Sequence, residues 1–79
     1  MARVLLFGPL RDLAGWRERQ IEAGSVHELR AFLASEDPDL GAALGGKGVQ
    51  VAVDQAVVRG DAALTPVSEV AFLPPMSGG

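Results

Sequence analysis

The segment Ser25-Val-His-Glu-Leu-Arg-Ala-Phe-Leu-Ala34 carries the clearest helix signal in the chain. Ser25 followed three residues later by Glu28 is a capping box, in which two side chains satisfy free N–H groups of the first helical turn. The apolar residues that follow fall on one helical face: Val26, Leu29, Phe32 and Leu33. We therefore predict an amphipathic helix from about Val26 to Ala34.

Two strands are predicted before this helix. Ala2 to Phe7 is a dense apolar stretch closed by Gly8-Pro9, which predicts a strand buried on both faces and central in a sheet. Pro9 can start a short helical turn that Gly15 ends in the left-handed conformation. Arg17 to Glu22 carries few apolar groups, so we expect a second strand that pairs with the first and lies at a solvated edge.

A short helix and three strands are predicted after the main helix. Asp37-Pro38 is a second helix-start signature, and Gly45-Gly46 ends this short helix. A tight hairpin is expected around Asp54-Gln55, and the last strand must end before Pro74-Pro75, because proline cannot donate a ladder hydrogen bond. The three strands are predicted at Val51 to Val53, Ala56 to Val58 and Glu69 to Leu73.

This order of elements predicts the fold class. A helix that crosses over after a first hairpin leaves the last strand free to pair beside the first strand, in a sheet covered on one face. We expect an α+β fold of the β-grasp, or ubiquitin-like, kind: a mixed five-stranded sheet with one main helix packed on one face. The domain is expected to span residues 1–73, and residues 74–79 are expected to form a flexible C-terminal tail.

Composition argues against several classes of function. A net charge of −3, with seven basic residues that do not cluster, argues against a nucleic-acid partner. The absence of cysteine excludes disulfides and thiolate chemistry. No apolar run approaches the ~20 residues that span a bilayer, and the N-terminus lacks the pattern of a signal peptide. We expect a cytoplasmic protein with no membrane partner.

An internal active site is not predicted either. The chain has one histidine, no cysteine and no tyrosine. His27 lies in the first turn of the predicted helix, where a solvated residue is far more common than a catalytic base. The segment Gly45-Gly46-Lys47-Gly48 lacks the spacing and the trailing Ser or Thr of a phosphate-binding loop. We therefore expect no metal and no cofactor of its own, and no catalysis by this chain alone.

The chain ends in Pro74-Pro-Met-Ser-Gly-Gly79. The proline pair favours an extended backbone, and Gly78 and Gly79 leave a backbone that can enter a channel too narrow for a Cβ atom. Six extended residues reach on the order of 20 Å, which would carry the terminal carboxylate into another protein's active site. A frayed terminus is the simpler explanation of two glycines taken alone.

Three segments together resemble the small subunit of molybdopterin synthase, a family of sulfur carriers that end in Gly-Gly. They are Val4-Leu-Leu-Phe-Gly-Pro-Leu-Arg-Asp-Leu-Ala-Gly15, Ala52-Val-Asp-Gln55 and Phe72-Leu-Pro-Pro-Met-Ser-Gly-Gly79, and the likeness covers nearly the whole chain. Two positions depart from the family pattern, with Asp12 where Glu is usual and Asp54 where Asn is usual.

The resemblance implies a mechanism that acts at Gly79. An adenylyltransferase of the ubiquitin-activating type would use ATP to adenylate the terminal carboxylate, and a sulfur donor protein would supply the sulfur that replaces AMP. The resulting thiocarboxylate would enter the large subunit of the synthase, which would hold the active site. It would give its sulfur there to cyclic pyranopterin monophosphate during molybdenum cofactor biosynthesis. The family further implies a heterotetramer with two copies of each subunit.

A carrier that visits several proteins needs an exposed apolar surface beside its tail. Alternation along the last strand places Val70 and Phe72 on one face and Ala71 and Leu73 on the other. If the first pair meets the helix, the other face is open. The residues predicted to contact partners are Phe7, Val57, Leu73, Pro75, Met76 and Ser77, with Arg11 at the charged rim. The alternative is that Phe7 and Val57 belong to the core.

Other functions fit the same residues. A carrier with the same chemistry could deliver sulfur to the thiamine thiazole or to a transfer RNA base. A ubiquitin-like interaction module without acyl chemistry is the alternative from another class, and it would not need Gly78 and Gly79. Conjugation to lysines of other proteins would also use an activated Gly-Gly terminus.

Overall fold

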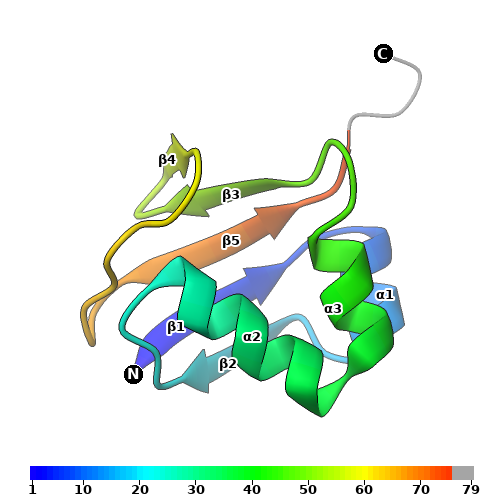
Figure 1. Cartoon of the computed structure of the whole chain (residues 1–79), viewed down its shortest axis with the longest axis horizontal. Helices are drawn as coiled ribbons and strands as arrows, with labels where there is room; N and C mark the ends of the chain where they lie inside the picture. The colour runs from blue at the N-terminus through cyan, green and yellow to red at the C-terminus, as the bar shows by residue number, and fades with distance from the viewer. Residues whose placement is uncertain (76–79) are drawn as a thin grey trace.

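In the computed structural model, which describes residues 1–75, helices cover one face of a five-stranded sheet (Figure 1). The strands are β1 (Ala2–Leu6), β2 (Glu18–Ile21), β3 (Gln50–Val53), β4 (Ala56–Val58) and β5 (Glu69–Leu73). The helices are α1 (Pro9–Ala14), α2 (Val26–Glu36) and α3 (Pro38–Leu44). Every predicted strand and helix is present, and most boundaries agree within two residues.

The sheet has the strand order β2-β1-β5-β3-β4. The first strand, β1, pairs antiparallel with β2 and parallel with β5. The last strand, β5, pairs antiparallel with β3, which forms a hairpin with β4. The first and last strands therefore lie side by side at the centre of a mixed sheet, and the predicted β-grasp arrangement is confirmed.

The start of α2 is held by the predicted capping box and by one unpredicted carboxylate. The Ser25 hydroxyl accepts from the Glu28 N–H at 3.1 Å, and the Glu28 carboxylate accepts from the Gly24 N–H at 2.8 Å. Asp61, distant in sequence, accepts the His27 N–H at 2.8 Å. That hydrogen bond is the main reason why the pKa of Asp61 lies below its ordinary value. The helix start is thus fixed from two parts of the chain.

The end of α2 lies two residues beyond the predicted one. Pro38 disfavours the helical conformation only at the residue before it, Asp37, so the helix can continue through Glu36. The Asp37 side chain then accepts from the Leu40 N–H at 3.2 Å and starts α3. One residue ends the first helix and caps the second.

The core lies between the sheet and the helix layer. As the strand alternation predicted, Val70 and Phe72 are fully buried there. Phe32 was predicted on the buried face of α2 but is 43% exposed, because it lies about 100° round the helix from Leu33. The other large side chains that are buried in this core are Val4, Leu6, Val26, Leu29, Leu33, Leu40 and Leu44.

The prediction that the first strand is buried on both faces is wrong. Ala2, Val4 and Leu6 are buried, but Arg3 is exposed and Leu5 is only partly buried. The cause is that the helices cover a single face of the sheet, so a central strand can bury only every second side chain. The central position of β1 was predicted correctly.

Candidate functional site

An apolar strip crosses the face of the sheet that the helices leave open. Strand register sets Leu5 beside Ala71, Ala71 beside Ala52, and Ala52 beside Val57, from four different strands. Paired residues on neighbouring strands share a face, so these side chains form one row. We call this surface the open-face strip: Leu5, Phe7, Ala52, Val57, Ala71 and Leu73.

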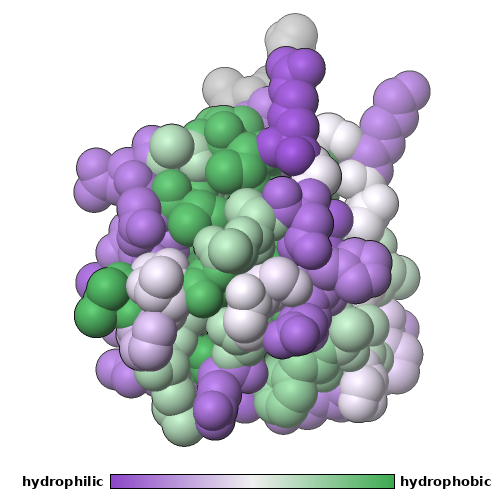
Figure 2. Space-filling model, turned by 60° about the vertical axis from the view of Figure 1, so that its left-hand side comes forward, coloured by the Kyte–Doolittle hydropathy of each residue, from purple (hydrophilic) through white to green (hydrophobic). Residues whose placement is uncertain are grey.

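Two members of the strip are strongly exposed. Phe7 is 45% exposed and Val57 is 55% exposed, so neither belongs to the core. Leu73 is partly buried at the end of β5, next to the two prolines. Figure 2, turned by 60° from the view of Figure 1, shows hydrophobic side chains in the upper part of the side drawn there, with hydrophilic side chains around them; the strip itself is defined by the strand register and not by this view. Exposed apolar surface of this kind is typical of protein contact sites.

The strip ends at a charged cluster near the start of β1. The Arg3 Nε lies 2.9 Å from a Glu18 carboxylate oxygen, and its Nη1 lies 3.2 Å from a Glu69 oxygen. The hydrogen bond from Arg3 is the main reason why the pKa of Glu18 lies below its ordinary value. The two carboxylates balance the charge of the guanidinium at the surface, and the cluster forms a polar border to the strip.

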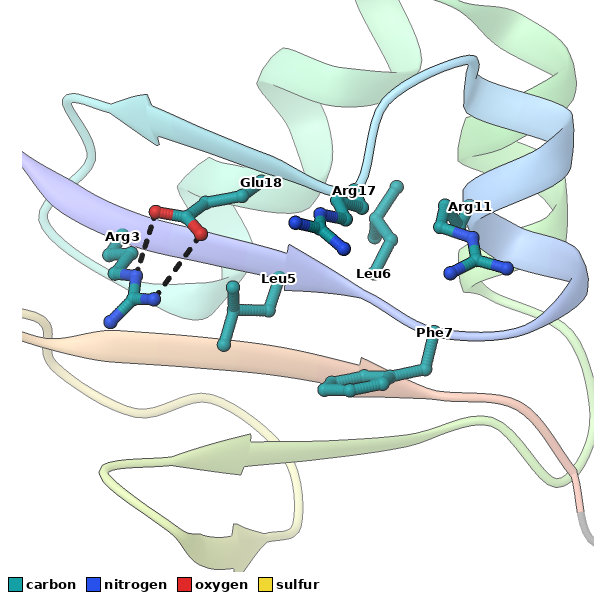
Figure 3. A pocket seen from close by; sticks show the side chains of 7 residues that line it. All are labelled: Arg3, Leu5, Leu6, Phe7, Arg11, Arg17 and Glu18. Carbon is teal, nitrogen blue, oxygen red and sulfur yellow. Dashed lines mark hydrogen bonds and ion pairs between the residues drawn. The ribbon is translucent and has the colours of Figure 1, made fainter.

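A hollow of about 310 Å³ runs along β1 from Arg3 to Phe7, and Glu18 also lines it. Figure 3 shows Leu5 and Phe7 lining it, with guanidinium groups from α1 (Arg11) and from the residue before β2 (Arg17) at its rim. The Arg11 Nε lies 3.8 Å from the Asp12 carboxylate, a long contact that leaves the guanidinium accessible. The strip therefore has a cationic corner within a chain whose net charge is −3.

The tail leaves the domain between two loops. Pro74 is partly buried and Pro75 is exposed. A Cβ atom built on Gly8, in the loop between β1 and α1, would lie 3.3 Å from the Pro74 Cγ. A Cβ atom built on Gly48, in the loop between α3 and β3, would lie 2.8 Å from the Pro75 Cβ. The first residues of the tail are thus packed against bare backbone on both sides.

The structure brings most of the predicted contact residues together. Phe7, Val57 and Leu73 lie on the open face, Arg11 lies at its cationic corner, and Pro75 lies at the root of the tail. The other predicted tail residues lie outside the described part of the chain: Met76, Ser77, Gly78 and Gly79. Their roles stay predictions.

Sequence reasoning missed several members of the site. Leu5 was not predicted as a site residue because its strand was expected to be buried on both faces. Arg17 was expected to lie in an edge strand that faces solvent. Ala52 and Ala71 join the strip only through the register between β3 and β5. The usable signal was the alternation within β1, which places Leu5 and Phe7 on the face opposite Val4 and Leu6.

Neither a metal centre nor a membrane span is found in the described part of the chain. Within residues 1–75, no three His, Cys, Asp or Glu side chains lie close enough together to hold a metal ion. None of the helices there is long and apolar enough to cross a membrane.

Comparisons with known proteins match the chain over its whole length. The model of the ThiS family matches residues 4–79. The molybdopterin synthase sulfur carrier subunit of Escherichia coli (strain K12) is 36% identical over 81 residues, which cover 100% of both chains. The crystal structure of SAMP1 from Haloferax volcanii has a TM-score of 0.85 at 23% identity, covering 99% of this chain and 98% of that one.

A second solved structure has the same arrangement. The small archaeal modifier protein 1 from Methanosarcina acetivorans has a TM-score of 0.87 at 23% identity, covering 99% of this chain and 95% of that one. At this level of identity the two structures support the fold, and the curated relative supports the family.

Proposed function

The chain belongs to the ThiS family of sulfur carriers, and from this premise we propose that it is the sulfur-carrier small subunit of a molybdopterin synthase. The observation that carries the proposal is the 36% identity to a protein of that name, over the full length of both chains. The family match extends to Gly79, so the terminal glycine pair lies within it.

The proposed chemistry takes place on the terminal carboxylate of Gly79. A carboxylate is a poor acyl donor, so it must first be activated. Its oxygen attacks the α-phosphorus of ATP on an adenylyltransferase, and pyrophosphate leaves. Sulfide, delivered by a sulfur donor protein, then attacks the carbonyl carbon, and AMP leaves. The product is a thiocarboxylate, formed without any side chain of this protein.

Transfer takes place on the large subunit. The tail inserts the thiocarboxylate beside a cyclic pyranopterin monophosphate, where its sulfur attacks an oxygen-bearing carbon of that substrate. A C–S bond forms as the C–O bond of that carbon breaks, and the oxygen leaves with the bonding electron pair. Hydrolysis of the resulting thioester restores the Gly79 carboxylate, and a second carrier repeats the transfer to complete the dithiolene. The 2:2 heterotetramer that the family implies is part of this proposal. ATP is consumed by the activating enzyme, and the carrier holds no cofactor of its own.

The open-face strip is the proposed docking surface for these partners. It lies beside the root of the tail, so a partner that covers Phe7 and Leu73 also meets the start of the tail. Arg11 and Arg17 at the corner of the strip favour a partner with acidic groups at the matching position. Charged pairs at a rim chiefly set orientation and association rate, while the apolar contacts supply affinity.

The alternatives differ in the acceptor or in the need for the tail. Delivery to the thiamine thiazole or to a transfer RNA base would use the same thiocarboxylate. An interaction module would use the open-face strip and leave Gly79 unmodified. The 36% identity to the Escherichia coli subunit favours the molybdopterin branch.

The test is mass spectrometry after incubation with ATP, the activating enzyme and a sulfur donor. A thiocarboxylate replaces one oxygen by sulfur, and this change equals the mass of a simple oxidation. Fragmentation must therefore locate it at Gly79, and Met1 and Met76 must be excluded as oxidised sites. A chain without Gly78 and Gly79 is the control. An unmodified Gly79 would favour the interaction module.

A second assay identifies the acceptor. The thiocarboxylated chain is mixed with the large subunit and cyclic pyranopterin monophosphate, and the dithiolene product is measured. If the thiocarboxylate forms but no dithiolene appears, the carrier chemistry is retained and the molybdopterin acceptor is rejected.

A further inference from the structure

We propose that Gly8 and Gly48 form a seat for Pro74 and Pro75, and that this seat sets the direction in which residues 76–79 leave the domain. Neither glycine belongs to the tail or to the open-face strip. Both would be positioning residues for the terminal carboxylate. The effect on reaction rate rests on the proposed function, whereas the geometry of the seat does not.

Strand register explains why these two glycines meet these two prolines. On one side, Leu6 pairs with Phe72 in parallel, so two residues further Gly8 lies opposite Pro74. On the other side, Gln50 pairs with Leu73 antiparallel, so two residues back Gly48 lies opposite Pro75. The seat is the continuation of the sheet past its last ladder hydrogen bonds, with the tail as the middle strand.

The contact at Gly48 is the tighter of the two. A Cβ atom there would lie 2.8 Å from the Pro75 Cβ and 3.6 Å from its Cα, closer than real Cβ atoms approach. The Pro75 Cβ belongs to a rigid ring and cannot swing away, so the backbone of the tail would have to move. The loop is held in place, since the Val49 N–H donates to the Gly46 carbonyl at 3.3 Å.

The contact at Gly8 is fixed by the start of α1. Its carbonyl accepts the Arg11 N–H at 3.1 Å and the Asp12 N–H at 3.3 Å, so its position follows the helix. A Cβ atom at Gly8 would lie 3.3 Å from the Pro74 Cγ, tighter than ordinary contact. Its φ of +56° also disfavours any other residue.

Two further glycines show that left-handed backbone alone does not explain the seat. Gly15 has a φ of +83° and Gly60 a φ of +74°, close to the +87° of Gly48. A Cβ atom at Gly15 or Gly60 would meet nothing within 4 Å. An alanine at Gly60 therefore imposes the same backbone cost as one at Gly48 without touching the tail.

The functional consequence is preorganisation. A tail that already leaves in one direction loses less conformational freedom when it enters a partner's channel. Misplacement of about 1 Å at a reacting group can lower a rate by about a hundredfold. We therefore expect Gly48→Ala to lower kcat for adenylation of Gly79 by about ten- to a hundredfold. KM should stay unchanged, because Phe7 and Val57 are not touched.

The structural test uses the absence of native cysteine. Spin labels at Ser77→Cys and at Ala31→Cys, an exposed position on α2, report the direction of the tail by pulsed electron resonance. We expect a narrower distance distribution in this background and in Gly60→Ala than in Gly48→Ala and Gly8→Ala, where it should be shifted or broadened. Equal distributions for Gly48→Ala and Gly60→Ala would overturn the proposal.

A second variant covers the case in which Gly48→Ala does not fold. Pro75→Gly removes the ring that Gly48 faces and leaves the domain intact, so the distance distribution should broaden with no loss of melting temperature. A distribution as narrow as that of the parent would show that the seat does not hold the tail.

The kinetic test is adenylation of the same glycine variants, without labels, by the activating enzyme. A lower kcat in Gly48→Ala than in Gly60→Ala, at equal KM, supports the positioning role, and equal kcat values overturn it. If the parent chain itself is not adenylated, the proposed function fails, and the distance measurement still decides whether the seat exists.

Discussion

At the scale of single residues, the chain offers a matched pair of exposed phenylalanines. Phe7 is 45% exposed on the open-face strip, and Phe32 is 43% exposed on α2, on the opposite side of the sheet. Their exposure is nearly equal, so truncation to alanine should cost similar stability in the free protein. Only Phe7 lies next to the cationic hollow and the root of the tail.

We predict that Phe7→Ala weakens binding to the large subunit by about 2 kcal/mol, roughly 30-fold in Kd, because a half-exposed aromatic ring beside a docking site is a common hot spot. Phe32→Ala should bind like the parent. Isothermal titration calorimetry measures both, and thermal melting confirms that both variants fold. Equal affinities for the two variants would show that the open face is not part of the interface.

At the scale of helices and strands, the elements set by local signals could be predicted well. The capping box at Ser25, the Asp37-Pro38 start and the proline pair after Leu73 each act within a few residues, and the structure has an element boundary at each. Glycines that end turns belong to the same class of signal. Such signals need no knowledge of the rest of the chain.

Features that depend on distant segments were predicted less well. The number of covered faces decides whether Leu5 is buried, and nothing within β1 reports that number. The register between β3 and β5 decides that Ala52 joins the open-face strip. The cap from Asp61 onto α2 likewise joins residues 34 positions apart. The Gly48 contact with Pro75 could be found from the sequence only after the strand register was known.

The hairpin between β3 and β4 shows how one turn combines both kinds of signal. Asp54 and Gln55 have φ values of 50° and 71°, the left-handed pair that suits a two-residue hairpin. The Asp54 carboxylate accepts the Glu69 N–H at 2.9 Å, and the Asp54 N–H donates to the Glu69 carbonyl at 2.8 Å. Asp54 therefore joins the turn to β5, a role for which its side chain is needed.

We predict that Gln55→Gly raises the free energy of unfolding by about 0.5 kcal/mol, because relief of left-handed strain exceeds the extra entropy of the unfolded chain. Asp54→Gly relieves similar strain but removes the acceptor of the Glu69 N–H, so it should destabilise the protein. Urea denaturation compares the two. Stabilisation by both changes would show that the hydrogen bond contributes little.

At the scale of the whole molecule, small size divides the sheet between two tasks. A chain of 79 residues has enough helix to cover one face of its sheet, and that face forms the core. The other face carries an apolar row that no helix covers, in which Phe7 and Val57 are strongly exposed, and the tail leaves at one end of it. Docking and sulfur chemistry are thereby placed on different parts of one small domain, which makes them separable by mutation.

Because docking and sulfur transfer depend on different parts of the chain, we predict that a chain able only to dock inhibits the synthase. A chain without Gly78 and Gly79 keeps the core and the open-face strip, so it should fold and bind the large subunit. It has no terminus that can carry sulfur into the active site. Added in excess to a synthase assay that contains thiocarboxylated parent chain, it should compete for the large subunit and lower dithiolene formation in proportion to its share of the total carrier.

Phe7→Ala in the truncated chain is the control, because it weakens docking and should relieve the inhibition. A truncated chain that does not inhibit would place most of the binding energy in the last two residues, contrary to the role given to the open face. A truncated chain that supports dithiolene formation by itself would mean that sulfur does not travel on Gly79. Inhibition would place the affinity in the strip and the sulfur chemistry in the tail. Absence of inhibition would place the affinity in the tail, and dithiolene formation would remove the sulfur chemistry from the tail.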